Sequence, residues 1–256
     1  MLIFVTNDKY MSYNLNYNNN ENDTNLDSVF NDKAADQHVI AKYITKVYGW
    51  MFLALCLTGI TAFLVASSDF AQQIMGSSRF VFFGLFLLQL FLVGFLSLRI
   101  NKLSSGTATA IFLGYAILTG VTFSVLLLAY PATLLAQTFG ITAGTFAVMS
   151  AVGYFTKKDL TSFGRLMMMA LIGIIIASVV NFFTQSATLY WIISYVGVAV
   201  FVGLIAYDTQ KIKQYALLEV EEDRKKGAIM GALALYLDFI NLFLMLLRIL
   251  GGGRKD

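Results

Sequence analysis

Seven apolar segments separated by short polar ones follow the first 40 residues of the chain. Each is close to the roughly 20 residues that an α-helix needs to cross a hydrocarbon core about 30 Å thick. They span residues 47–66, 80–98, 108–129, 133–155, 166–183, 189–208 and 228–250. Pro131 marks the tight turn between the third and the fourth. The pattern predicts an all-α polytopic membrane protein with seven transmembrane helices.

The first 40 residues have the opposite character. They are rich in asparagine and acidic residues, and they carry too little apolar surface to offset the entropy of ordering them. The apolar run LIFV near the start is too short for a signal peptide and has no basic flank. We therefore expect a disordered Asn-rich cytoplasmic tail over residues 1–40. A seven-helix transmembrane domain over residues 41–256 follows, with its first helix as the insertion signal.

Composition narrows the classes of function. Hydrophobic residues make up 58% of the chain and charged residues 13%, with a mean hydropathy of +0.71, so a second soluble domain has no room. The single histidine, His38, lies in the polar tail, and the single cysteine, Cys56, lies in an apolar run. These counts exclude a disulfide framework and a His or Cys metal site in the membrane part. We expect the protein to have no cofactor and no nucleic-acid partner. Its expected surroundings are membrane lipids.

The positive charges predict an orientation. If the N-terminus is cytoplasmic, 14 of the 18 Lys and Arg residues fall in inside segments and 4 in outside segments. This asymmetry favours a cytoplasmic N-terminus. The basic C-terminus, with Arg248, Arg254 and Lys255, goes against that trend. A last segment that re-enters the membrane instead of crossing it therefore remains an alternative to seven crossings.

Two acidic residues lie in apolar segments, and all the others fall in the tail, the loops or the C-terminus. Asp208 ends the sixth segment in LIAYDTQKIK, and Asp238 lies in the seventh in YLDFINLF. A charge near the middle of a spanning helix costs roughly 2.5–3.5 kcal/mol, so such a residue faces the bundle interior and has a partner. Asp238 belongs to a stripe of small or polar residues spaced by three or four: Gly227, Gly231, Ala234, Asp238, Asn241, Met245 and Arg248.

The sixth and seventh helices are joined by a short loop, so they are antiparallel neighbours. Asp238 is 11 residues from Gly227, or roughly 16 Å along the helix, which allows the two carboxyl groups to meet. Two carboxylates in contact share a proton and act as a pH sensor. Arg99, at the inner end of the second helix, is the best-placed cation to compete for one of them. Each residue also has a simpler explanation: Arg99 as one of the positive charges that favour the cytoplasmic side, Asp208 as a residue at the membrane interface, and Asp238 as a carboxyl group with only a structural hydrogen-bonding role.

The chain resembles the bacterial branch of the Bax inhibitor-one family, also called the transmembrane Bax inhibitor motif family. Four stretches carry the resemblance: SLRINKLSSGTATAIF, ITAGTFAVMSAVGYFTKKDL, VGLIAYDTQKIK and GALALYLDFINLFLMLLRILG. The resemblance implies that the other six helices surround the last one, in a bacterial inner membrane. It also implies paired aspartates at Asp208 and Asp238, and an arginine latch that matches Arg99. The chain departs from the family pattern in two places. Its third helix lacks the glycine-proline pair often found there, and its Asn-rich tail has no counterpart.

Three functions are consistent with these features. The resemblance implies a pH-sensitive calcium leak, in which protonation of the Asp208 and Asp238 pair alters its link to Arg99 and opens a cation route. Calcium, as the transported ion, is then expected near the two carboxyl groups, since it prefers oxygen ligands. The second reading is a scaffold that binds and modulates a membrane protease or a stress or cell-death partner.

The third reading is an intramembrane aspartyl protease, because two carboxylates sharing a proton also form an acid and base pair. Leu235, Tyr236 and Leu237 stand before Asp238 where that class has a Gly-x-Gly run, and the chain has no Pro-Ala-Leu. We therefore expect a protein that is not an enzyme.

Overall fold

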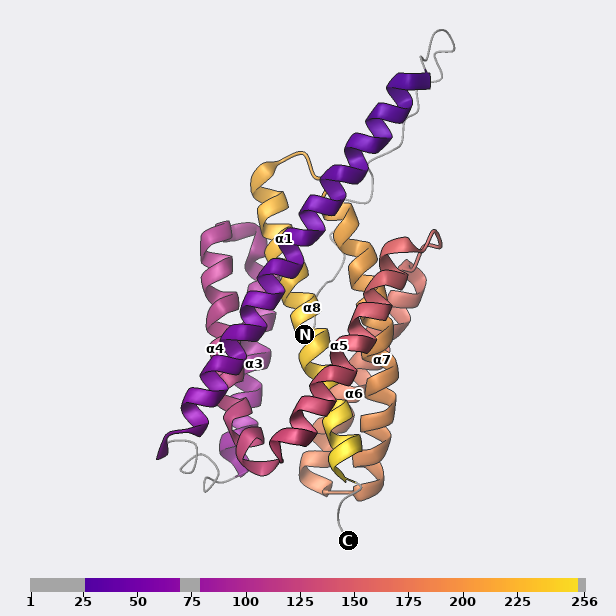
Figure 1. The fold of residues 1–256 in the computed structure, drawn as a ribbon. Helices are drawn as coiled ribbons and strands as arrows, with labels where there is room; N and C mark the ends of the chain where they lie inside the picture. Colours follow the sequence, from indigo (N-terminus) through magenta and orange to yellow (C-terminus); the bar gives the residue numbers. More distant parts are fainter. Residues whose placement is uncertain (1–25, 70–78, 253–256) are drawn as a thin grey trace.

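A computed structural model describes residues 26–69 and 79–252 of the chain (Figure 1). These residues form long helices with no strand among them, and seven of the helices are long and apolar enough to cross a membrane. The helices are α1 (Leu26–Ala66), α3 (Arg79–Arg99), α4 (Ser105–Ala129), α5 (Ala132–Phe155), α6 (Thr161–Thr184), α7 (Ala187–Tyr215) and α8 (Glu221–Gly252), with the 3-10 turn η2 (Ile100–Lys102). The predicted all-α fold with seven spans is confirmed.

The first helix begins earlier than the apolar pattern indicates. α1 starts at Leu26 and extends beyond the bundle as one continuous helix (Figure 1). No glycine or proline occurs between Leu26 and Tyr48, so nothing in this stretch interrupts helical backbone geometry. Residues 26–40, which the sequence analysis assigned to a disordered tail, are therefore helical. The remainder of that predicted tail, residues 1–25, lies outside the described residues.

The last helix is the most buried element. In α8, 78% of the most apolar 18-residue window is buried, against 11–50% in the other six spans. It packs against α1, α4, α5 and α7. Residues 228–240 are buried without a break, so protein covers the whole circumference of the helix here and not only the small-or-polar stripe. The expectation that all six other helices surround α8 stays a prediction.

α8 runs the length of the bundle. It is unbroken over 32 residues. Gly251 near its end lies against Tyr130, which follows α4, and Gly252 lies against Trp191 in the first turns of α7. The C-terminal end of α8 is thus at the opposite end of the bundle from the α7–α8 loop (Figure 1). This path matches a crossing helix rather than a re-entrant one, whereas the orientation of the chain in the membrane stays a prediction.

Close helix contacts occur at particular glycines. The position of a Cβ on Gly153 of α5 overlaps the backbone of Ala206 in α7, and one on Gly231 of α8 would lie 2.8 Å from Ile212 Cγ1 in α7. By contrast, Gly140 and Gly144 of α5, which have the spacing of a packing pair, have nothing within 4 Å of a Cβ. Close approach in this bundle therefore holds α5, α7 and α8 together.

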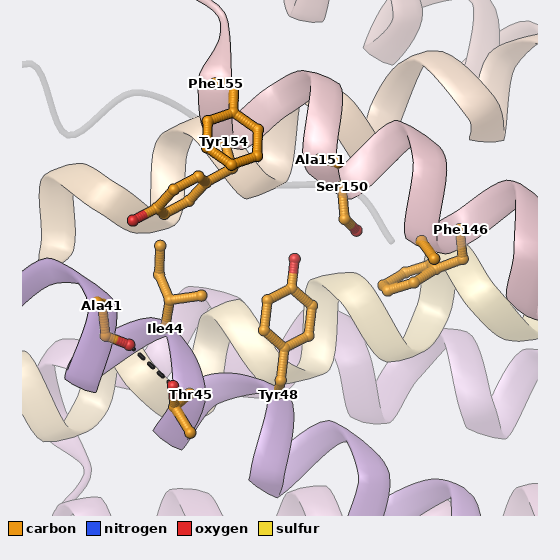
Figure 2. Close-up of a pocket in the computed structure, with 10 residues that line it drawn as sticks. Ala41, Ile44, Thr45, Tyr48, Phe146, Ser150, Ala151, Tyr154 and Phe155 are labelled. Carbon is orange, nitrogen blue, oxygen red and sulfur yellow. Dashed lines mark hydrogen bonds between the residues drawn. The ribbon is translucent and has the colours of Figure 1, made fainter.

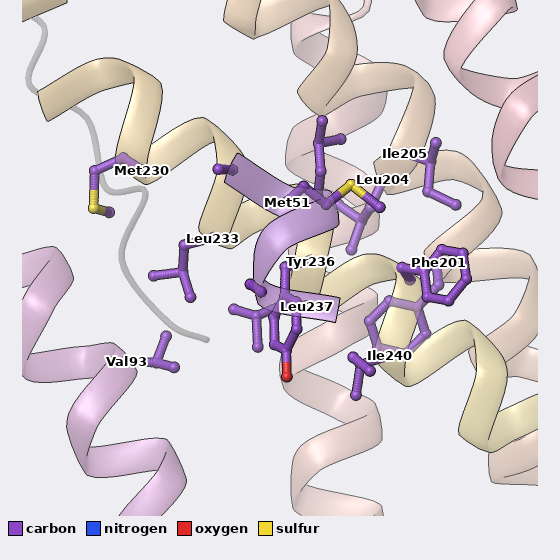
Figure 3. Packing of buried hydrophobic residues seen from close by; sticks show 14 of the residues in the cluster. Met51, Val93, Phe201, Leu204, Ile205, Met230, Leu233, Tyr236, Leu237 and Ile240 are labelled. Atoms are coloured by element: carbon purple, nitrogen blue, oxygen red, sulfur yellow. The ribbon is translucent and has the colours of Figure 1, made fainter. Parts of the chain in front are cut away.

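A buried hydroxyl pair ties three helices together at the centre of the bundle. The Tyr236 hydroxyl of α8 lies 2.7 Å from Thr58 Oγ1 of α1, and Thr58 Oγ1 donates to the Ala116 carbonyl of α4 at 2.9 Å. Because the Thr58 proton is used in that bond, Tyr236 is the donor to Thr58. Figure 3 shows Tyr236 among apolar side chains that include Met51 of α1 and Phe201 of α7.

We expect the Tyr236→Phe substitution to lower the free energy of unfolding by about 0.6–1 kcal/mol. This is the usual value of one interhelical hydrogen bond in a membrane bundle, and the ring packing is retained. Tyr195→Phe is the matched control, because Tyr195 is 59% exposed. Unfolding of the purified variants in mild detergent measures the difference. Equal losses at the two positions would show that the buried bond has no special role.

Candidate functional site

α7 and α8 bring Asp208 and Asp238 together. The two residues are 9% and 4% exposed, and their carboxyl groups are close enough to interact electrostatically. Two ionised carboxylates have no donor between them, so a hydrogen bond between the two groups would require a proton on one of them. Their packed helices place the pair in the interior of the bundle, away from lipid.

One oxygen of the pair has no other donor nearby. Within residues 26–69 and 79–252, no N–H or hydroxyl group donates to the buried Oδ2 atom of Asp238. A buried carboxylate oxygen without donors is costly, because its lost hydration is not replaced. The burial of this oxygen therefore favours a pair that holds a proton.

Lys211 is the positive charge that acts on the pair. It lies one turn beyond Asp208 on α7 and interacts electrostatically with that carboxyl group. Its Nζ atom lies 5.7 Å from the centre of the Tyr207 ring. The spacing of three residues on one helix signals this interaction in the sequence. The cation predicted from the sequence to compete for one of the two carboxyl groups is nevertheless Arg99.

The structure does not bring Arg99 to the pair. Arg99 is the last residue of α3 and is exposed, and α3 packs mainly against α4. The cation that acts on Asp208 is Lys211, and a separate surface ion pair joins Lys225 to Glu221 at 2.8 Å. The latch between Arg99 and an aspartate thus stays a prediction, and it requires α3 to move relative to α7 and α8.

A groove of about 490 Å³ lies between α1 and α5 (Figure 2). Tyr48 of α1 and Ser150 of α5 extend into it from opposite sides. The Tyr48 hydroxyl is 3.4 Å from Oγ1 of Thr209, the residue after Asp208. The buried Ser150 hydroxyl has no hydrogen-bond partner among the described residues. The Tyr48 hydroxyl therefore connects the groove to the residue next to Asp208, and no sequence spacing indicates this arrangement.

The pair alone is a poor resident metal site. Calcium takes six to eight oxygen ligands, and the described residues contain no cluster of three or more His, Cys, Asp or Glu side chains. Two carboxyl groups supply fewer oxygens than a stable calcium site needs.

The sequence motifs agree with the result of comparing the chain with known protein families. A family model described as "Inhibitor of apoptosis-promoting Bax1" matches residues 40–255, almost the whole chain after the polar tail. The chain belongs to the Bax inhibitor-1 family. The resemblance found in the sequence is thereby confirmed, and the chain is an integral membrane protein.

Relatives in this family come from diverse bacteria. Inner membrane protein YbhL of Escherichia coli K12 is 49% identical over 215 residues, covering 83% of this chain and 92% of the relative. An uncharacterized protein of Borreliella burgdorferi is 45% identical over 217 residues, covering 84% and 94%. Protein RP147 of Rickettsia prowazekii is 44% identical over 220 residues, covering 84% and 91%. Of these three names, that of YbhL gives a membrane location, and none gives an activity.

Proposed function

We propose that this Bax inhibitor-1 family protein is a pH-sensitive cation leak channel that carries calcium, gated by protonation of Asp208 and Asp238. The observation that carries this proposal is the carboxyl pair buried between α7 and α8. These are the two spans with the largest buried share, at 50% and 78%. A change of charge in such a place acts on the packing of the whole bundle.

The number of protons on the pair sets the strength of the bond between the helices. With one proton, the carboxyl groups form an O–H···O⁻ bond, which is roughly twice as strong as a neutral one. A second proton replaces it with a neutral bond and removes the negative charge that faces Lys211. The contact between α7 and α8 then weakens, and acidic pH favours the open state.

The groove between α1 and α5 offers an approach to the gate. Most of its wall is apolar, with hydroxyl groups from Tyr48 and Ser150, and the Tyr48 hydroxyl is 3.4 Å from Oγ1 of Thr209. Hydroxyl, carbonyl and carboxylate oxygens are the ligands that calcium prefers. In the open state a cation approaching along this groove meets the carboxyl pair, and Arg99 becomes available as a partner for one of its members.

The test is calcium efflux from liposomes that contain the purified protein, recorded across acidic and neutral pH. We expect about tenfold faster efflux at acidic pH, the ratio that corresponds to about 1.4 kcal/mol between closed and open states. Efflux that is the same at every pH would exclude gating by the pair. A protein without efflux that co-purifies with one stable membrane protein would support the scaffold function instead.

Asp159→Asn is the control for a general effect of removing a carboxylate. Asp159 lies in the α5–α6 loop and accepts hydrogen bonds from the Thr161 hydroxyl, at 2.6 Å, and from the Thr161 backbone N–H, at 2.9 Å. These bonds hold the pKa of Asp159 below its ordinary value, so it stays ionised from neutral to mildly acidic pH. The control should keep the full pH dependence.

A further inference from the structure

A second cavity shares no lining residue with the α1–α5 groove. Its volume is about 330 Å³, and side chains of α3, α4, α6, α7 and α8 line it. Along α8 the lining extends from Leu237 to Arg248, about 16 Å at 1.5 Å per residue. A volume of that size spread over that length makes the cavity long and narrow. Aromatic and aliphatic side chains form most of its wall.

The polar side chains along the middle of this cavity already have partners. Asn241 donates to the Leu237 carbonyl at 2.7 Å, and Ser178 donates to the Ile174 carbonyl at 2.7 Å. The Gln89 amide donates to Thr122 Oγ1 at 2.9 Å. Each of these groups uses a donor within the protein, and most of the surrounding wall is apolar, so the middle of the cavity suits a hydrocarbon chain.

One end of the cavity is different, because Arg248 lies there. Its guanidinium carbon is 5.4 Å from the centre of the Tyr190 ring. Within residues 26–69 and 79–252, Arg248 has no carboxylate partner at ion-pair distance. A guanidinium has five N–H donors in a planar arrangement that fits a carboxylate or a phosphate. A cation of this kind inside a spanning helix indicates a binding site with an anionic partner.

Aromatic residues place this end of the cavity at the level of lipid headgroups. Trp191 lies 5.8 Å from Tyr190 and 5.9 Å from Tyr195, between ring centres, and Tyr130 lies against the end of α8. Trp and Tyr side chains concentrate at the boundary between hydrocarbon and water. Arg248 is therefore at the depth where the anionic head of a lipid lies, and the cavity extends from it toward the membrane centre.

We propose that this cavity binds an anionic amphiphile, with one hydrocarbon chain along α8 and a carboxylate or phosphate head at Arg248. Phe83 of α3 and Phe182 of α6, at 4.5 Å between ring centres, form part of the wall along this hydrocarbon chain. The site is separate from the carboxyl pair, so it does not depend on the proposed leak activity.

Native mass spectrometry of the purified protein in neutral detergent tests this site. The probes are oleate, dioleoyl phosphatidylglycerol and dioleoyl phosphatidylcholine. We expect the two anionic probes to reach half-saturation at about tenfold lower concentration than phosphatidylcholine, the size of one charge-assisted contact. Oleate binding without phosphatidylglycerol binding identifies a free fatty acid as the ligand, and the converse identifies a phospholipid. Equal binding of all three probes would overturn the proposal.

Two variants separate the head site from the chain site. Arg248→Gln should lose the tenfold preference for the anionic probes, whereas Lys102→Gln, which removes an exposed cation beyond α3, should keep it. Ser178→Phe fills the cavity and should weaken binding of both anionic probes. Ile176→Phe adds bulk at a position on α6 that is 60% exposed and should leave binding unchanged. Equal effects of Arg248→Gln and Lys102→Gln would show non-specific charge attraction and would contradict the site.

Photocrosslinking of the wild-type protein tests the site without any substitution, so its result does not depend on whether a variant folds. A photoreactive fatty acid with a diazirine on its chain should crosslink to the cavity-facing residues of α3, α6 or α8. Unlabelled oleate should reduce this crosslinking. Crosslinks confined to lipid-facing positions such as Ile176 would contradict the proposal.

Discussion

The Asp238→Asn protein is expected to leak calcium at neutral pH about as fast as the wild type does at acidic pH, about tenfold above the wild-type rate at neutral pH. Asparagine has nearly the size of aspartate and no charge, so it resembles the protonated residue. Its amide N–H can donate to the Asp208 carboxylate, but this bond is longer than the O–H···O⁻ bond of two carboxyl groups that share a proton. The α7–α8 contact should therefore be weaker than in the wild type at neutral pH.

The same flux assay, run at several pH values, checks this result. Asp208→Asn should have the same effect, and the double variant should add little to either single one, because the two groups act as one unit. Asp159→Asn, which alters an exposed loop carboxylate, should behave as the wild type. An Asp238→Asn protein that keeps the wild-type pH profile would exclude the pair as the gate.

The Gly153→Ala substitution is expected to lower the free energy of unfolding by about 1–3 kcal/mol, the usual cost of overpacking. The Cβ of an alanine at this position would overlap the carbonyl group of Ala206, which belongs to the backbone of α7. A backbone group cannot rotate away as a side chain can, so α5 and α7 must separate. Ala206 is two residues before Asp208, and the separation should also disturb the carboxyl pair.

Gly144→Ala is the matched control in the same helix. A Cβ at this position has nothing within 4 Å, and alanine favours helix over glycine by up to about 1 kcal/mol. Thermal unfolding of both variants in detergent should therefore show a clear loss for Gly153→Ala and little change or a small gain for Gly144→Ala. Similar losses in both would mean that the Gly153 contact is not a determinant of stability.

The sequence predicts most of the fold because the governing signals are local. A spanning helix is recognised from about 20 successive residues, and all seven spans were found in this way. The proximity of Asp208 and Asp238 also follows from local information, since a short loop makes α7 and α8 antiparallel neighbours. The start of α1 at Leu26 was missed because a polar composition predicts disorder, although no residue in that stretch breaks a helix.

Contacts between helices that are distant in sequence were harder to predict. The rotation of each helix about its axis decides which face meets which neighbour, and a uniformly apolar span carries little information about that angle. Gly140 and Gly144 thus have the spacing of a packing pair and face open space, whereas Gly153 makes the close contact. For the same reason, neither the separation of Arg99 from the pair nor the approach of Tyr48 to Thr209 could be read from the sequence.

The most direct test of gating by the carboxyl pair is calcium efflux from liposomes after a pH change, with the wild type and the Asp208→Asn, Asp238→Asn double variant measured side by side. Gating by the shared proton predicts wild-type efflux that rises as the pH falls from neutral to acidic, and efflux from the double variant that is the same at both. A double variant whose efflux rises on acidification as the wild type's does would contradict it.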